Sequence, residues 1–206
     1  MPDLEDLVGE RLMFGLPGPA LRDEDVRLFN DTRAAGLILY RRNFESPAAL
    51  RRLLESLETR LGRRLLVATD HEGGRVIMLG QGTTIFPDSL AMGTAGEEAF
   101  AYRQGLVEAR ELRRLGVDLN LAPVLDVLTE RYSPNIGIRS YGKDPKLVAR
   151  YGTARIKGMA RGGHAGAGAG ACERWPSVSR SMPRSRRISE SVPRDVAEIV
   201  SRAMRA

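Results

Sequence analysis

The chain has 206 residues, of which 42% are hydrophobic and 28% are charged, a composition typical of a globular protein and not of a disordered one. Its single cysteine, Cys172, excludes an internal disulfide, and with the two histidines, His71 and His164, it falls one ligand short of a structural zinc site. The net charge of +6 is compatible with an anionic partner such as nucleic acid, but this charge is unevenly distributed along the chain.

The first predicted elements are two short strands followed by a helix. The apolar runs 11–16 and 35–40 are continuous rather than alternating, which is typical of strands buried on both faces of a parallel sheet. Ser46 and Pro47 are an N-cap and first-turn pair and Gly62 is a stop signal, so a helix is predicted between them. Its apolar stripe consists of Leu50, Leu53, Leu54, Leu57 and Leu61.

The next elements repeat this order. Residues 63–70 form a third apolar run and predict a third strand. Thr94 and Glu97 match a capping box and predict the start of a second helix, which ends before Gly116. Its apolar positions are Leu106, Leu112 and Leu115.

A fourth strand and a third helix complete the regular part of the sequence. The strand is predicted over 116–123, and Asp144 with Pro145 predicts the start of the helix. Strands that alternate with helices at this spacing indicate an α/β fold built on a parallel sheet. The apolar face of the third helix contains Leu147, Val148, Tyr151 and Ile156.

Polar side chains follow the predicted strands, where α/β folds place their ligand sites. The segment 70–75, DHEGGR, follows the third strand, and Arg41, Arg42 and Asn43 follow the second. Carboxylates accept hydroxyl hydrogens and guanidinium groups donate to oxygens, so the combination suits a polyhydroxylated ligand. The candidate site residues are Asp70, Glu72, Arg75, Asn120, Asp126 and Arg139.

Each of these residues also has a purely structural interpretation. Asp70 suits the cap of a turn in which Gly73 and Gly74 supply positive φ angles. Arg75 suits an ion pair with Glu72 or Asp70, and Arg139 taken alone suits an exposed surface arginine. His71 is interpreted as a supporting group rather than a catalyst, because no nucleophile that it would activate lies nearby in the sequence.

Four segments in order resemble the N-terminal domain of glycoside hydrolase family 3, most closely its bacterial β-N-acetylhexosaminidases. They are GLILYRRNFES (36–46), ATDHEGGRV (68–76), LGVDLNLAPVLDV (115–127) and GIRSYGKDP (137–145). Four motifs in order are far more specific than a single short pattern. The resemblance covers roughly residues 5–163 and implies that a domain of residues 1–163 forms about the first half of a (β/α)8 TIM-type barrel, that is, a partial barrel.

The resemblance also implies a substrate and a site. The family cleaves β-linked sugars with retention of configuration, so the implied partner is a carbohydrate. The branch that the motifs resemble implies a sugar of the N-acetylglucosamine type, simple β-glucosides stay open as an alternative, and no metal or organic cofactor is implied. Asp70 would bind sugar hydroxyls and Arg139 would also contact the substrate. Glu72 and Arg75, with Asn120 and Asp126, would shape or support the pocket. Many relatives carry an arginine where this chain has Met78, which removes one substrate contact.

Residues 164–206 differ in character from the rest of the chain. They contain no leucine, lysine, phenylalanine or tyrosine, and their eight arginines and four acidic residues supply +4 of the net charge. Such a segment cannot bury enough apolar surface to offset its ordering entropy, so an irregular or disordered tail is predicted. The abrupt change at residue 164, where a family motif should begin, favours a frameshift or another disruption of the gene.

The family's catalytic groups are not identifiable in this tail. Relatives continue with a Lys-His-Phe-Pro-Gly motif, an Asp-His acid/base loop and an aspartate nucleophile, whereas here His164 has no neighbouring aspartate and Asp195 is the tail's only one. Retaining hydrolysis needs both a nucleophile and an acid/base group. We therefore expect a truncated hydrolase that is inactive alone, and a half-barrel that is poorly soluble or partly folded.

Three other interpretations remain at this stage. In the first, the chain is a non-catalytic sugar-binding remnant. In the second, it is a nucleic-acid-binding protein that uses its basic segment 180–194. Residues 166–171 also match a dinucleotide-binding loop, but no convincing strand precedes them.

The acidic start of the sequence lacks a signal peptide's apolar segment, and no run approaches the ~20 apolar residues of a membrane span, so we expect a cytoplasmic protein without a membrane partner.

Overall fold

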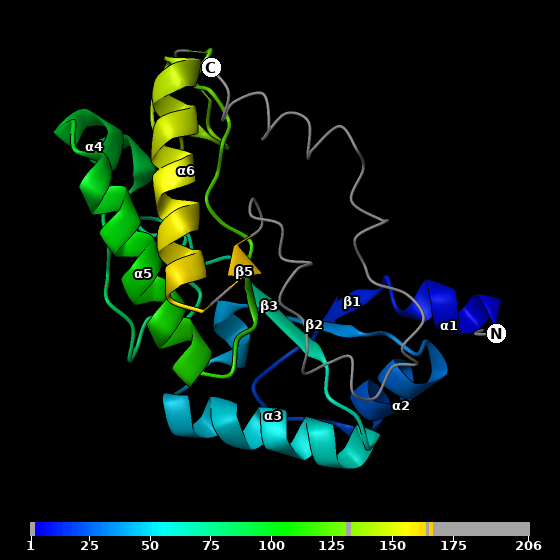
Figure 1. Ribbon diagram of the computed structural model, residues 1–206. Coiled ribbons are helices and arrows are strands. Elements are labelled where there is room, and N and C mark those ends of the chain that lie inside the picture. Colours follow the sequence, from blue (N-terminus) through cyan, green and yellow to red (C-terminus); the bar gives the residue numbers. More distant parts are fainter. Residues whose placement is uncertain (1–2, 131–132, 164, 167–206) are drawn as a thin grey trace.

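The computed structural model describes residues 3–130, 133–163 and 165–166, and its centre is a parallel five-stranded sheet (Figure 1). The strands are β1 (Met13–Gly15), β2 (Gly36–Leu39), β3 (Leu66–Thr69), β4 (Leu119–Asn120) and β5 (Ala165–Gly166). They are paired in chain order, β1-β2-β3-β4-β5, and each pair is parallel. The four predicted strands and the parallel α/β class are confirmed.

Helices connect successive strands. In Figure 1, α3 runs beneath the sheet, whereas α5 and α6 stand side by side at its other end and make the most extensive helix–helix contact. Two 3-10 helices, η1 and η2, lie in the connections after β2 and β4. The helices are α1 (Leu4–Gly9), α2 (Asp23–Asp31), η1 (Arg41–Asn43), α3 (Pro47–Leu61), α4 (Ser89–Ala95), α5 (Glu98–Arg114), η2 (Gly137–Arg139) and α6 (Pro145–Arg161).

The ends of α3 and α6 follow the predicted capping signals. The Ser46 side chain accepts a hydrogen bond from the Ala49 amide, and Gly62 ends α3 with a φ of +64°. The Asp144 side chain accepts a hydrogen bond from the Lys146 amide at the start of α6. These side chains satisfy amide groups that have no partner inside the helix.

The predicted capping box at Thr94 and Glu97 is wrong. Thr94 lies inside α4, where its hydroxyl donates to the Leu90 carbonyl, and Glu97 makes no side-chain capping bond. Gly96 adopts a φ of +81° and ends α4, so α5 begins only at Glu98. Glycine reaches this left-handed conformation without steric penalty, and this stop signal outweighs the Thr-x-x-Glu pattern.

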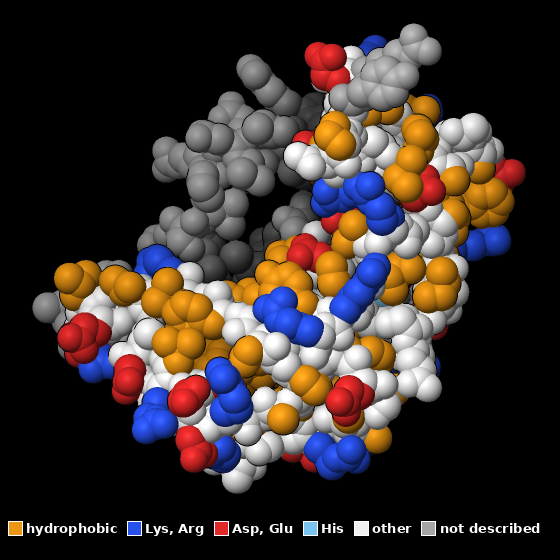
Figure 2. Space-filling model, turned by 180° about the vertical axis from the view of Figure 1, so that it is seen from behind, with side chains coloured by type: hydrophobic (Ala, Val, Ile, Leu, Met, Phe, Trp, Pro, Cys, Tyr) orange, Lys and Arg blue, Asp and Glu red, His pale blue; other side chains and the backbone are white. Residues whose placement is uncertain are grey.

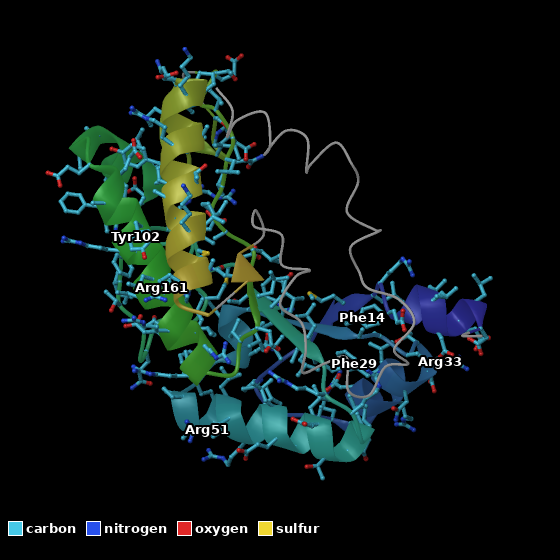
Figure 3. The ribbon with its side chains drawn as sticks, in the orientation of Figure 1. Phe14, Phe29, Arg33, Arg51, Tyr102 and Arg161 are labelled. Atoms are coloured by element: carbon cyan, nitrogen blue, oxygen red, sulfur yellow. The ribbon has the colours of Figure 1, made fainter. Side chains whose placement is uncertain are left out.

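The main core lies between the sheet and the helices α2 and α3. Phe29 from α2 packs edge-on against Phe14 from β1, with ring centroids 6.0 Å apart (Figure 3). A second cluster lies at the opposite end of the sheet between α4, α5 and α6 and contains Tyr141, Val148 and Tyr151. The two clusters fix the sheet from both ends and so hold the strand ends in place.

The prediction that residues 164–206 are irregular is wrong at the start of this segment. Residues 165–166 form β5, which pairs with β4, although they belong to the segment predicted to be irregular. The rest of that segment, including residues 180–194 and 167–171, lies outside the described residues. In the part that the structure describes, none of the helices combines the length and apolar character needed to cross a membrane.

Candidate sugar-binding site

The predicted site residues come together at the carboxyl ends of the strands. Asp70 directly follows β3, Asn120 is the last residue of β4, and Arg139 belongs to η2 in the connection between β4 and α6. Seen from behind, basic side chains gather in the concave middle of the molecule (Figure 2). Parallel pairing in chain order therefore unites residues that are up to 69 positions apart.

The segment 70–76 forms a tight turn that explains its two glycines. Gly73 and Gly74 adopt φ angles of +90° and +55°, as the structural interpretation predicted. The Glu72 amide donates to the Val76 carbonyl at 2.8 Å, and the Gly74 amide donates to the Phe86 carbonyl at 2.8 Å. A Cβ on Gly74 would lie 2.6 Å from the Cβ of Asp88, so this position is also sterically closed to larger residues.

Glu72 and Arg139 form a bidentate ion pair at the centre of the site. Arg139 Nε donates to Glu72 Oε2 and Arg139 Nη2 donates to Glu72 Oε1, each at 2.7 Å. Arg139 Nη1 also donates to the Asn135 carbonyl at 2.9 Å. A guanidinium has five N–H groups, so two of them remain unused among the described residues. Arg139 is therefore held in a fixed orientation and keeps donors for a ligand.

Arg75 does not pair with Glu72 or Asp70, so that prediction is wrong. The Gly73–Gly74 turn leads the chain outward, and the exposed Arg75 instead donates from Nη2 to the Pro134 carbonyl at 3.2 Å. Arg139 occupies the position beside Glu72 that Arg75 was predicted to take. Arg75 thus tethers the segment that precedes η2.

Asp70 is half-buried and remains available for a ligand. No hydrogen bond or ion pair fixes its carboxylate among the described residues. Burial raises the pKa of Asp70, the negative charge of Glu72 raises it further, and the positive charge of Arg139 opposes both effects. The result is a carboxylate that lies near an arginine with unused donors, at the carboxyl ends of the strands.

Asn120 and His71 support the turn from the interior. The Asn120 side chain accepts from the His71 amide and donates to the His71 carbonyl, both at 2.9 Å. The His71 side chain is buried, and burial together with the positive charge of Arg155 lowers the pKa of His71 to about 4. Its imidazole is therefore neutral at physiological pH and faces the protein interior.

Asp126 and the residues after β2 lie at the edge of the site. Asp126 is exposed, its backbone carbonyl accepts from the Ser140 hydroxyl at 2.6 Å, and its charge contributes to the raised pKa of Arg139. Arg41 donates from Nη2 to the Arg75 carbonyl at 2.8 Å, and the buried Asn43 donates to the Leu16 carbonyl at 2.9 Å. These contacts brace the connections around Asp70.

Three residues behind the site were missed by the sequence analysis. Gln104 and Glu108 on α5 and Arg155 on α6 are buried and hydrogen-bond to the backbone of the 70–76 turn or to one another. The available signal was spacing, because Arg155 lies at a helical repeat of the apolar positions Val148 and Tyr151. Charged residues at core positions of an amphipathic helix are candidates for buried networks.

A cavity of about 350 Å³ lies elsewhere, between α3 and the end of α5. It is lined at the sheet by Leu37 and Leu65, close to the starts of β2 and β3, whereas Asp70 follows the end of β3. Among the described residues, no three histidine, cysteine or carboxylate side chains form a group that could hold a metal ion. The strand-end cluster, by contrast, places the unfixed carboxylate of Asp70 near the unused donors of Arg139.

Comparison with known proteins identifies the family. Residues 4–169 match the model described as the glycosyl hydrolase family 3 N terminal domain. The chain is 39% identical to the β-hexosaminidase of Thioalkalivibrio sulfidiphilus and 37% identical to that of Haemophilus influenzae, in each case over 76% of this chain. These alignments cover 47% and 45% of the relatives, so the chain spans about half their length.

Solved structures agree with the sequence relatives. A family-3 β-N-acetylglucosaminidase from Paenibacillus superimposes with a TM-score of 0.76 at 35% identity, over 81% of this chain and 32% of that one. NagZ from Neisseria gonorrhoeae in complex with N-trifluoroacetyl-D-glucosamine superimposes with a TM-score of 0.70 at 33% identity, over 75% of this chain and 48% of that one. The match to the family model spans the sheet and the strand-end residues, and this chain belongs to glycosyl hydrolase family 3.

Proposed function

We propose that residues 1–163 form the first half of a family-3 barrel and bind an N-acetylglucosamine-type sugar at the strand ends. Asp70 accepts hydrogen bonds from sugar hydroxyls, and Arg139 donates to a sugar oxygen. Glu72 orients Arg139, Arg75 holds the segment before η2, Asn120 fixes the turn, and Asp126 contributes negative charge at the edge. The names of the relatives, β-hexosaminidase and β-N-acetylglucosaminidase, support this class of sugar.

One observation carries the proposal. Asp70 presents an unfixed carboxylate beside Arg139, whose guanidinium is immobilised by Glu72 yet keeps two N–H groups unused. An acceptor and a donor of fixed position match the alternating hydroxyl and carbonyl groups of an N-acetylated sugar. Because the guanidinium is already ordered, little conformational entropy is lost when the sugar binds.

We further propose that this 206-residue chain does not hydrolyse glycosides by itself. Retention requires two groups about 5 Å apart, a nucleophile and an acid/base. The family's Lys-His-Phe-Pro-Gly, acid/base and nucleophile motifs are not identifiable in the sequence after residue 163. The purified chain should therefore release no chromophore from an aryl N-acetyl-β-glucosaminide, and measurable release that scales with protein concentration would contradict this part of the proposal.

Sugar binding is tested with two conservative variants and two matched controls. D70N removes the anionic acceptor. R139K keeps the positive charge beside Glu72 but loses the bidentate hydrogen bonding to the Glu72 carboxylate. D31N and R51K make the same changes at exposed positions on α2 and α3; Figure 3 shows Arg51 on α3, beneath the sheet. Binding of N-acetylglucosamine is measured by titration calorimetry or by ligand-observed NMR.

We expect weak binding by the wild-type chain and by both controls. D70N and R139K should each weaken it by about tenfold or more, the effect of losing one charge-assisted hydrogen bond. Unchanged affinity in both site variants would overturn the assignment of Asp70 and Arg139. Absence of binding in the wild-type chain would overturn the proposed function itself.

A further inference from the structure

A buried ion pair lies directly behind the proposed sugar site. Arg155 on α6 and Glu108 on α5 have side chains that are 0% and 1% exposed. Arg155 Nη2 donates to both carboxylate oxygens of Glu108, at 2.8 and 3.0 Å, and Arg155 Nε donates to Oε2 at 3.2 Å. The pair therefore links the two helices that stand side by side in Figure 1.

The same groups also hold the backbone of the site. Arg155 Nη2 donates to the His71 carbonyl at 3.1 Å. Gln104 lies one turn before Glu108 on α5, and its Nε2 donates both to Glu108 Oε1 at 2.8 Å and to the Glu72 carbonyl at 3.2 Å. Two consecutive peptide carbonyls, those of His71 and Glu72, are thus fixed by side chains from the helices behind the sheet.

Stability alone does not account for this arrangement. Removing two charges from water is costly, and apolar pairs of similar volume often replace buried ion pairs without loss of stability. An apolar pair would, however, leave the Arg155 contact with the His71 carbonyl unmade, and Asn120 would be that carbonyl's remaining side-chain donor. The His71 carbonyl beside Asp70 and Glu72 therefore gains a buried donor from Arg155 that an apolar side chain would not supply.

We propose that Arg155, Glu108 and Gln104 are positioning residues that set the direction of the Asp70 and Glu72 side chains. Glu108 orients the Arg155 guanidinium, Arg155 fixes the His71 peptide, and Gln104 fixes the Glu72 peptide. Rotation of either peptide would swing Asp70 away from the sugar or separate Glu72 from Arg139. The inference rests on the proposed sugar-binding function and adds residues from α5 and α6 that do not touch the ligand.

The test compares two double variants on the same two helices. E108L/R155M replaces the buried pair with apolar side chains. R150M/E98L makes the equivalent change at the exposed α6–α5 ion pair, where Arg150 Nε lies 3.2 Å from Glu98 Oε1. Affinity for N-acetylglucosamine, the thermal unfolding midpoint and amide hydrogen exchange of residues 71–76 are measured on the full chain.

The two variants should separate positioning from stability. We expect E108L/R155M to keep the unfolding midpoint, to bind the sugar about tenfold more weakly, and to exchange the amides of residues 71–76 about tenfold faster. R150M/E98L should match the wild type in all three measurements. A folded E108L/R155M variant with wild-type affinity and wild-type exchange in this segment would overturn the inference.

Two further results keep the outcomes distinct. If the wild-type chain binds no sugar, the proposed function fails, while the exchange rates of residues 71–76 still decide whether the network holds the turn. If E108L/R155M does not fold, Q104M removes the donor to the Glu72 carbonyl and to Glu108 Oε1, but it leaves the Arg155–Glu108 ion pair in place. Q104M should then show faster exchange confined to the turn, and exchange equal to that of the wild type would overturn the inference.

Discussion

Asp70 and Glu72 are two carboxylates, two positions apart, in opposite environments. The Glu72 side chain is 5% exposed and is neutralised by Arg139, whereas Asp70 is half-buried and has no fixed partner among the described residues. Breaking a buried pair by removing one partner costs about 3–5 kcal/mol, so Glu72 depends on Arg139 for the stability of the fold. Asp70 has no comparable structural role, so its carboxylate is available to bind a ligand.

His71 should make the folded state sensitive to acid. Its pKa is about 4 in the folded chain and 6.5 in the unfolded one, so the unfolded chain binds more protons between these values. Stability that is present above pH 6.5 is therefore lost as the pH falls through this window towards 4, by at most about 3 kcal/mol. We expect H71Q to lose less stability than the wild type over the same range, measured by thermal unfolding at several pH values. Equal losses in the two proteins would show that His71 is not the group responsible.

At the scale of single residues, the sequence predicted where the site residues lie in the fold better than it predicted which side chains they pair with. Asp70 and Asn120 follow from strand ends, and the positive φ angles of Gly73 and Gly74 follow from the Gly-Gly pair. The partner of Glu72 was not predictable, because Arg139 lies 67 positions away, in the irregular connection between β4 and α6. Side-chain partners across such a distance depend on the whole path of the chain.

Helices α5 and α6 approach each other so closely at Gly105 and Gly158 that these two positions leave no room for a side chain. A Cβ on Gly158 would overlap the Tyr102 carbonyl of α5, and a Cβ on Gly105 would overlap the Arg155 carbonyl of α6. The two glycines lie in opposite helices and allow the backbones to touch. This close approach brings Glu108 within reach of Arg155.

A single methyl group should therefore separate the two helices. We expect G158A to destabilise the chain by about 1–3 kcal/mol, because the helix backbones cannot relax as a flexible side chain would. G80A provides the control, since no atom lies within 4 Å of the Cβ added at Gly80. Urea unfolding measures both variants, and equal midpoints for G158A and the wild type would contradict the contact.

The elements that the sequence predicted are those with strong terminal signals. Ser46 and Gly62 delimit α3 because their roles depend only on neighbouring backbone groups. Helix α4 was missed because its seven residues, SLAMGTA, contain three small polar or flexible residues (Ser89, Gly93 and Thr94) and too few turns to show a period. Short helices of this kind are held by tertiary contacts, here by packing against η2, α5 and α6.

For the whole molecule, the open sheet predicts self-association. Among the described residues β1 and β5 each pair with one strand, so each presents an edge. We expect the 206-residue chain, expressed alone, to associate as its concentration rises, which size-exclusion chromatography with light scattering would detect. A monomer that unfolds in one cooperative transition at every concentration would contradict this expectation and the half-barrel proposal behind it.

The order of the strands bears on how the chain is made. Among the described residues, each strand after β1 pairs with the strand that precedes it in the sequence, so none of these pairings waits for a segment synthesised much later. As the chain leaves the ribosome, the first three strands and α3 can assemble before η2 and α6 exist. Arg139 and Arg155 are synthesised after the 70–76 turn that they contact, which makes completion of the proposed sugar site a late event in the synthesis of each molecule.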